Sequence, residues 1–516
     1  MSKYQFCKEK EYILYQGKMQ DVIDNCIEEN SIDSIITDPP YELNFMGKSW
    51  DNSGVAFQKE TWERCFKVLK PGGYLLAFGG TRTYHRIACA IEDAGFEIRD
   101  CIMWLYGSGF PKSMDISKQI DKKGGNNYSI EFAEDLKKAR ISRNLTMKYC
   151  DDKYCNGSTN WSWYEGRKDG CRVPDYQTYL EIVKEFPELE KYRELIKEAE
   201  REVIGTKKSG CFNSQEKDRY TIGSSTSLEV DITIPSTDLA KQWQGWGTCL
   251  KPAFEPIIVA RKPFKGSLVD NVLEWGVGGL NIDECRVAFE NTPNPATNPL
   301  YRKQANYKLP EKGQQSNGAV NFTSSKNETN ELGRFPANVI LTYDETDFDE
   351  VCGAFPSEKG NSASRYFYCA KASKKDRDEG LDKFEEKQVY GNDMNWGYGN
   401  NNGDNFGERI ANVKRKNTHP TVKSVELMQY LIRLVTPKNG VVMDCFMGSG
   451  STGKAVMFEN RERNANYKFI GIEMTEEYLP ICHSRIDYAL NKYEYDEIKQ
   501  RVEEHKLGIQ NIFDFM

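Results

Sequence analysis

The stretch FMGSGSTGKA, residues 446–455, follows directly on the apolar run VVMDC and decides the fold. Its three glycines spell G-x-G-x-x-G, which is typical of a strand-to-helix turn that holds a dinucleotide. The stretch also nearly matches a phosphate loop, but that motif needs Ser or Thr after its lysine to hold magnesium, and here Ala455 follows Lys454. A nucleoside pocket without any phosphate fits the same glycines.

An acidic residue supports a nucleoside ligand. Glu473 ends the next predicted strand, KFIGIE, 20 positions after Gly453. That spacing allows a carboxylate to grip ribose hydroxyls. Because such an acid suits any adenosine-containing ligand, the loop alone does not separate NAD from S-adenosylmethionine, and a structural turn without a ligand remains an alternative.

The surrounding sequence alternates strands and helices. Near the N-terminus the expected elements are SIDSIITDPPY, ETWERCFKVLK, YLLAFGG, YHRIACAIEDAG and FEIRDCIMWL. Near the C-terminus they are SVELMQYLIRLV, VVMDCF, a helix after the glycines, KFIGIE and EEYLPICHSRIDYAL, and EPIIVA at 255–260 adds one more buried strand. This alternation predicts an α/β fold with a doubly wound, mostly parallel sheet.

Composition sets the broad class. The chain has 516 residues, a net charge of −7, 15 cysteines and 39% hydrophobic residues, a share that indicates a core diluted by polar insertions. We find neither an apolar signal segment nor a run approaching the ~18 apolar residues of a membrane span. We therefore expect a soluble, cytoplasmic protein with reduced thiols, in which any nucleic-acid contact needs a local basic patch.

A second motif, TDPPY at residues 37–41, stands at the end of a predicted buried strand, where open α/β sheets place their sites. Asp38 supplies a carboxylate, and Tyr41 supplies a flat aromatic face. Pro39 and Pro40 stiffen the turn and remove two amide donors, so that carbonyl groups can face a pocket. This set suits a planar base with an exocyclic amino group. A stiff turn with a surface tyrosine is the alternative without function.

The chemistry explains why such a base needs help. The exocyclic amine of adenine or cytosine is a poor nucleophile, because its lone pair is delocalised into the ring. If Asp38 and a proline carbonyl accept both amino protons, the nitrogen can become pyramidal and attack a positioned sulfonium methyl, by orientation and electrostatics. A base in a duplex must first be flipped out, and Tyr41 could then stack on it.

Several separated motifs together resemble the amino-directed DNA methyltransferases, which use S-adenosylmethionine. DPPY resembles their catalytic motif, DCFMGSGST (444–452) their cofactor loop, and HPTVKSVELMQYLI (419–432) the segment before that loop in one subgroup. LKPGG, GSGFPK and FIGIE also look like this family. The catalytic motif comes first and the cofactor loop last, which is the permuted β arrangement of the methyltransferase fold. The resemblance covers roughly residues 10–120, 240–290 and 412–490.

The resemblance implies roles for single residues. Asp38, Pro39, Pro40 and Tyr41 would bind and activate the target base. Glu473 would hold the ribose hydroxyls, and the methionine end of the cofactor would meet His419 and Thr421. The remaining cofactor-binding positions would be Asp444, Phe446, Gly448, Gly450 and Thr452. The sequence departs from the family pattern at Ser424 and Cys445, where proline is common.

A ring-carbon methyltransferase would need a cysteine nucleophile after a proline, and the chain has no Pro-Cys pair. We therefore expect direct transfer, without a covalent enzyme–base intermediate and without a metal. The spacing of Cys150, Cys155, Cys171 and Cys211 does not match paired C-x2-C zinc sites.

The expected domains follow from the motifs and the changes in composition. They are the catalytic half with DPPY (1–120), a helical insertion (121–239), a core strand (240–264), a target-recognition region (265–411), the cofactor-binding half (412–492) and a tail (493–516). The stretch at 390–410 has low complexity and is expected to be a mobile loop. Within the insertion, LKKARISRNLT (136–146) and the sequence after it resemble a degenerate helix-turn-helix, with a helical decoration or dimer contact as the alternative.

Two basic clusters are candidates for DNA binding. They interleave with aromatic residues in RYFYCAKASKKDR (365–377) and stand together in VKRK (413–416). Such clusters suit phosphate contacts, which position a protein on DNA without specifying sequence, although an ordinary solvated face gives the same pattern. The candidate residues are Arg365, Lys371, Lys374, Lys375, Arg377, Lys414, Arg415 and Lys416.

Together these features predict a site-specific methyltransferase acting on N6 of adenine in double-stranded DNA, with N4 of cytosine as the alternative. A catalytically dead DNA-binding protein and an NAD-linked enzyme are less well supported. We expect no membrane partner. A homodimer, a cognate restriction nuclease and the recognition sequence are left open.

Overall fold

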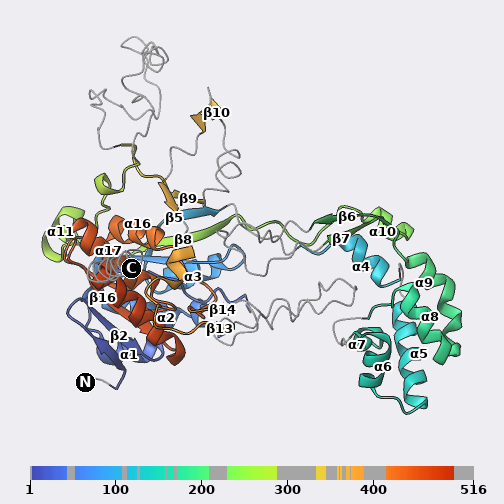
Figure 1. Ribbon diagram of the computed structural model, residues 1–516. Coiled ribbons are helices and arrows are strands. Elements are labelled where there is room, and N and C mark those ends of the chain that lie inside the picture. The colour runs from blue at the N-terminus through green and yellow to red at the C-terminus, as the bar shows by residue number, and fades with distance from the viewer. Residues whose placement is uncertain are drawn as a thin grey trace, which may run out of the picture. The chain divides into compact units, whose positions relative to one another are not determined.

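The computed structural model describes residues 3–43, 53–106, 113–124, 128–156, 160–166, 171–208, 229–287, 333–343, 357–358, 361–362, 368–371, 374–388 and 414–492. The GSGFPK motif at 107–112, the stretch at 390–410 and the tail from 493 lie outside them. The chain divides into two compact units (Figure 1). The first comprises 1–108, 253–385 and 416–516, and the second 109–252 and 386–415.

The first unit is built on one ten-stranded sheet. In spatial order its strands are β1 (Gln5–Lys8), β2 (Tyr12–Gln16), β16 (Lys468–Glu473), β15 (Val441–Asp444), β3 (Ile32–Thr37), β4 (Leu69–Phe78), β8 (Phe254–Arg261), β5 (Glu97–Tyr106), β9 (Val339–Tyr343) and β12 (Tyr368–Lys371).

Most neighbouring strands run parallel. The run β2–β16–β15–β3–β4 is parallel throughout, and so are β5–β9 and β9–β12. β15, from the C-terminal part of the chain, pairs with β3, from the N-terminal part, so the two predicted halves share one sheet. The predicted mostly parallel α/β fold is therefore confirmed.

Alternation along each strand sends side chains to two separate cores. Ile35, Leu75 and Met443 pack on one face with helices α1 (Met19–Cys26), α2 (Lys59–Val68) and α3 (Tyr84–Asp93). Their neighbours Ile36, Leu76 and Val442 pack on the other face with α16 (Val425–Val435), α17 (Ser451–Arg463) and the helix at 479–492. Because successive strand residues point to opposite faces, an almost wholly apolar strand requires such cover on both sides.

Three strands depart from the simple alternation. β8 was expected as a buried strand, and it runs antiparallel to both β4 and β5. β9 and β12 come from the region expected to recognise the target, yet they extend the core sheet. In the same region, α11 (Leu268–Trp275) begins with a capping box at Ser267 and packs against β4, and the short α14 spans Lys374–Asp378.

The second unit is largely helical, and it contains the segment 121–239 for which a helical insertion was predicted. Its helices are α4 (Ile116–Lys122), α5 (Tyr128–Ser142), α6 (Met147–Tyr154), α7 (Trp161–Tyr164), α8 (Tyr176–Glu185), α9 (Arg193–Ala199) and α10 (Asp238–Gln242), and β6 (Val203–Lys208) pairs with β7 (Glu229–Thr233). Figure 1 shows these helices grouped together. Phe132, Trp161 and Phe186 are fully buried in their common core.

The predicted helix-turn-helix segment does form two helices joined by a short turn. Asn144 adopts a left-handed φ of 54° in the turn, and the side chain of Thr146 caps α6 by accepting from Tyr149 N. Cys150 and Cys155 are buried in the apolar core, and burial raises the pKa of each to about 12. Cys211 lies outside the described residues.

Among the described residues, no helix combines the length and the apolar character needed to cross a membrane.

Candidate methyl-transfer site

The predicted site residues stand at one edge of the sheet. β16, β15 and β3 are parallel neighbours, so their carboxyl ends lie together. Glu473 ends β16, Asp444 ends β15, and Asp38 follows β3. Two strand spacings of roughly 4.8 Å separate the first strand from the last. Thr37 Oγ1 donates to Asp444 Oδ1 over 2.7 Å, which ties together segments 407 positions apart in the chain.

The end of β3 carries a compact polar cluster. The hydroxyl of Tyr41 lies 2.8 Å from Asp38 Oδ1 and 2.9 Å from Glu255 Oε2. Lys423 Nζ lies 2.9 Å from Asp38 Oδ2, 3.1 Å from Glu255 Oε2 and 3.1 Å from the Tyr41 hydroxyl. These four residues, Asp38, Tyr41, Glu255 and Lys423, form what we call the acceptor cluster.

The acceptor cluster is largely withdrawn from water. The Lys423 side chain is 11% exposed, and its ammonium lies 5.0 Å from the ring centre of Phe78 and 5.7 Å from that of Trp104. Burial alone would lower the pKa of Lys423, but Asp38 and Glu255 outweigh it and raise the pKa above its ordinary value. Burial, together with the same two carboxylates, raises the pKa of Tyr41 well above 10. The lysine is therefore charged and the phenol neutral near pH 7.

Glu255 and Lys423 were not among the residues predicted for the site. Glu255 stands near the start of β8, and because β8 is antiparallel, its start lies at the same edge as the ends of its neighbours. Lys423 lies within HPTVKSV, just before α16, among motif residues with no assigned role. Predicting Glu255 would have required the direction of β8, and predicting Lys423 would have required its contacts with Asp38 and Glu255.

The end of β16 forms the other part of the site. Glu473 is 9% exposed; its Oε2 accepts from Gly448 N over 2.9 Å and its Oε1 from Thr475 N over 2.7 Å. Burial raises the pKa of Glu473, and the backbone donors partly offset this. Each carboxylate oxygen has a further lone pair, so Glu473 can still accept from two hydroxyls.

The glycine loop has the backbone that its sequence predicts. Gly448 and Gly450 have φ of 56° and 77°, the left-handed region that favours glycine. A Cβ on Gly448 would lie 2.9 Å from His419 Nε2, and one on Gly450 would lie 3.1 Å from Cys482 Cα. A Cβ on Gly453 would lie 2.5 Å from Phe469 Cε1, so this glycine lets α17 pack closely on β16.

The Asp444 carboxylate accepts hydrogen bonds that hold the glycine loop in place. It accepts from Thr37 Oγ1, from Thr452 Oγ1 at 2.5 Å and from Phe446 N at 3.1 Å. Burial raises the pKa of Asp444 to about 6, against the effect of these donors. Asp444 and Thr452 are thus engaged with each other, while Phe446 is half-buried at the start of the loop.

His419 lies against the loop. Its Nδ1 is 2.5 Å from the carbonyl oxygen of Thr421. A carbonyl only accepts, so Nδ1 carries the proton and Nε2, on the Gly448 side, is left as an acceptor. Burial lowers the pKa of His419 to about 4, which keeps the ring neutral. The ring also meets Tyr478 edge-on, with centroids 4.6 Å apart.

These residues fit an adenosine-containing cofactor with a positively charged tail. A buried carboxylate with spare acceptor capacity suits the ribose diol, and a neutral histidine acceptor beside the loop suits an ammonium donor. Room beside Gly448 exists only because it lacks a Cβ.

A sequence profile of the N6/N4 DNA methylases matches residues 32–484, well over half of the chain. The chain belongs to this family. Its membership confirms the resemblance seen in the motifs, and S-adenosylmethionine is the methyl donor of this family.

Several related proteins are type II methyltransferases. The chain is 38% identical to M.HpaI of Haemophilus parainfluenzae over 147 residues, which is 27% of this chain and 46% of the relative. It is 34% identical to M.BglI of Bacillus subtilis over 93 residues, 18% of this chain and 25% of the relative. The chain spans less than half the length of the curated relatives it matches.

Solved structures align along most of the chain but with low scores. PvuII DNA methyltransferase (cytosine-N4-specific) has a TM-score of 0.35 at 12% identity, covering 94% of both chains. M1.HpyAVI has a TM-score of 0.31 at 13% identity, covering 92% of this chain and 98% of the other. The family assignment therefore rests on the sequence match.

The predicted DNA-binding residues fall in different places. Arg365 lies outside the described residues, and for Lys371, Lys374, Lys375 and Lys414 only the backbone is described. Arg377 donates to the carbonyl oxygens of His419 and Pro420 over 3.1 and 3.3 Å, so its guanidinium supports the cofactor side. Lys416 lies 3.7 Å from Asp382, and Arg415 belongs to the two-residue strand β14 (Lys414–Arg415), which pairs with β13 (Lys387–Gln388).

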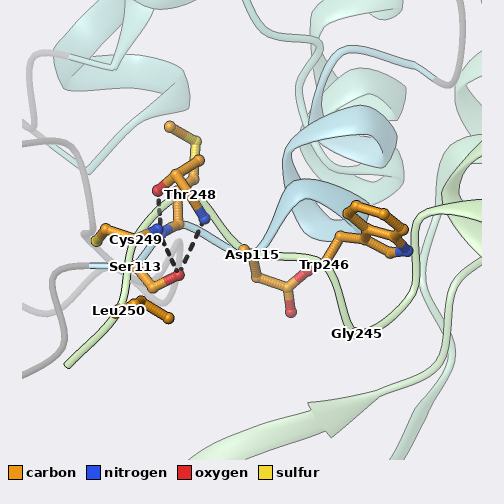
Figure 2. A pocket seen from close by; sticks show the side chains of 9 residues that line it. Ser113, Asp115, Gly245, Trp246, Thr248, Cys249 and Leu250 are labelled. Carbon is orange, nitrogen blue, oxygen red and sulfur yellow. Dashed lines mark hydrogen bonds between the residues drawn. The ribbon is translucent and has the colours of Figure 1, made fainter. Parts of the chain in front are cut away.

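A hollow of about 650 Å³ lies in the second unit (Figure 2). Its polar groups mainly join the two chain segments that line it: Ser113 Oγ accepts from Thr248 N over 3.0 Å, and Thr248 Oγ1 accepts from Met114 N over 2.9 Å. None of the predicted site residues lines it.

Proposed function

We propose that the protein is a DNA methyltransferase that uses S-adenosylmethionine to methylate the exocyclic N6 of adenine in duplex DNA, after the base has been flipped out. The observation that carries this proposal is the Asp38 carboxylate at the end of β3, one strand away from β15 and its glycine loop. Family membership supports amino-directed transfer. Asp in the first position of the catalytic motif leans toward adenine in this family, which favours N6 over N4 of cytosine.

The acceptor side of the reaction follows from the contacts. Asp38 accepts a hydrogen bond from the target amine and aims its nitrogen. The Tyr41 hydroxyl is held by Asp38 and Glu255, which fixes the ring as a platform for the flipped base. Bound S-adenosylmethionine supplies an electrophilic methyl carbon. The amine loses one proton overall, and the Asp38 carboxylate that already accepts its hydrogen bond is positioned to receive it.

Duplex DNA is the proposed substrate, and residues 265–411, without the strands β9 and β12, are the proposed target-recognition region. Lys416 and the lysines at 371, 374, 375 and 414 are proposed phosphate contacts, together with Arg365 and Arg415. The type II names of the relatives support a cognate restriction nuclease as a further partner. A homodimer and a DNA contact by the α5–α6 pair remain predictions.

The proposal is tested by product analysis. Purified protein, duplex DNA and S-adenosylmethionine are incubated, and the digested nucleosides are analysed by mass spectrometry. We expect N6-methyladenosine in its deoxy form, and none with Asp38→Ala. N4-methylcytosine as the sole product would overturn the adenine assignment. Calorimetry with NAD and with S-adenosylmethionine should show binding of the latter alone.

A further inference from the structure

The acceptor cluster holds two carboxylates against one ammonium, and both oxygens of Asp38 are already engaged. Oδ1 accepts from Tyr41 and Oδ2 from Lys423. Each oxygen keeps a further lone pair, but an incoming amine competes for this carboxylate with two donors that are already present. Tyr41 cannot leave without moving the stacking platform, whereas Lys423 has a flexible stem and a second carboxylate within reach at Glu255.

Lys423 has the chemistry of the group it would have to make way for. Its ammonium is a nitrogen donor placed 2.9 Å from Asp38 Oδ2 and enclosed by the rings of Tyr41, Phe78 and Trp104. A flipped adenine would offer the same carboxylate an N–H on a flat ring that can stack on an aromatic platform.

The charge of Lys423 also matters for Asp38. Without it, two carboxylates would face each other across one neutral phenol in a site largely closed to water. Like charges so placed disfavour double ionisation, so loss of the ammonium would favour uptake of a proton by one of them. A protonated Asp38 would lose acceptor capacity toward the target amine.

We propose that Lys423 is a positioning residue of the methyl-acceptor site, which keeps Asp38 an ionised acceptor and yields Asp38 Oδ2 to the amine of the flipped base while Glu255 retains it. The inference rests on the proposed function and concerns the same site. Glu255 thereby becomes the residue that makes the exchange reversible. After transfer, the return of Lys423 to Asp38 would help to displace the methylated base.

The test begins with wild-type protein and DNA carrying the site found by methylation-aware sequencing. If the wild type methylates no DNA, the result contradicts the proposed function. A result that differs only in the variants bears on this inference. Lys423→Met is then compared with Lys438→Met, a matched control at an exposed lysine just after α16. Single-turnover rates are measured from pH 5.5 to 9.5, with calorimetry of S-adenosylmethionine as a check on folding and cofactor binding.

For Lys423→Met we expect the acidic limb of the rate profile to move up by about one pH unit or more, with the lost rate regained at high pH. The KM for DNA should not rise, since the competing donor is gone. A wild-type profile in this variant would overturn the inference, and so would a raised KM with an unchanged rate, because Lys423 would then act on DNA. The charged and titratable groups facing the cluster are Asp38, Tyr41, Glu255, Tyr106, His419 and Asp444.

Glu255→Gln provides a second, isosteric variant that keeps the test decisive if Lys423→Met does not fold. Lys423 then has one carboxylate instead of two, so yielding Asp38 becomes less favourable. We expect the KM for DNA to rise severalfold, about three- to tenfold, with a nearly unchanged rate at saturation. A KM within error of the wild type, or a lower one, would contradict the exchange.

Discussion

The two ends of the site are built by opposite means. At the cofactor end, Glu473 and Asp444 take their hydrogen bonds from neighbours in the glycine loop and the strand ends, and the contacts are local except for Thr37. At the acceptor end, charged side chains from residues 38, 255 and 423 meet, and in the proposed exchange Lys423 changes partner when substrate arrives. A rigid pocket serves a cofactor that always binds in the same way, whereas a base that enters and leaves requires donors that can be exchanged.

The largest effect is expected at the acceptor end. Asp38→Ala removes the acceptor for the amine, so turnover should fall by about a thousandfold or more, while the Kd for S-adenosylmethionine stays within about twofold. Methyl-transfer assays and calorimetry measure the two quantities. Asp24→Ala, at a surface acid paired with Arg64, is the control. If Asp38→Ala abolished cofactor binding as well as turnover, the result would contradict separate roles for the two ends of the site.

A substitution at the cofactor end should affect cofactor binding rather than the rate of methyl transfer. Glu473→Gln weakens two charge-assisted contacts and the proposed ribose contact, so the Kd for S-adenosylmethionine should rise by about 10- to 100-fold. The rate at saturating cofactor should change little. Glu476→Gln, at an exposed acid three residues on, is the control. An unchanged Kd would mean that the cofactor does not lie on β16.

Gly450→Ala tests whether the loop backbone is as rigid as its contacts indicate. At φ 77°, with Cys482 Cα 3.1 Å from the new Cβ, the substitution should cost about 1–3 kcal/mol of unfolding free energy. Chemical denaturation measures this. Gly279→Ala, where a Cβ meets nothing within 4 Å, should cost less. Equal costs would argue against a strained loop.

His419 should make stability depend on pH. Burial lowers the pKa of His419 to about 4 in the fold, against an ordinary value of 6.5, so the unfolded chain binds the proton first as the pH falls. The contribution of His419 is therefore complete above about pH 6.5 and lost progressively toward pH 4. The stability difference between wild type and His419→Gln should shrink from pH 7 to pH 5 in thermal unfolding. His85→Gln, exposed on α3, is the control, and a constant difference would contradict the neutral ring.

The smallest effects are expected for two basic residues, Arg377 and Lys416, which were both candidates for DNA binding. Arg377→Ala should weaken cofactor binding slightly, because its guanidinium holds the His419 and Pro420 carbonyls. Lys416→Ala should instead lower the slope of log affinity for DNA against log salt by about one. Fluorescence anisotropy at several salt concentrations distinguishes them. An equal reduction of the slope in both variants would indicate that Arg377 also contacts DNA.

The contrast between the two ends also explains what the sequence could predict. The glycine loop, Glu473 and the strand that carries Asp38 follow from local patterns, since a left-handed φ requires glycine and a buried strand requires apolar residues on both faces. Glu255 could not be predicted, because its place depends on the antiparallel direction of β8. β9 and β12 were missed because the polar sequence around them hides two short strands. Arg377 was assigned by charge alone, which says nothing of the carbonyls it meets.

A crystal structure with sinefungin, which carries an amine in place of the sulfonium methyl, would show whether the two strand ends form one site. We expect its ribose hydroxyls to lie on Glu473 and its amine to face the Asp38 carboxylate across the site. An analogue bound with its amine turned away from Asp38, or bound elsewhere, would contradict a single site formed by the two strand ends.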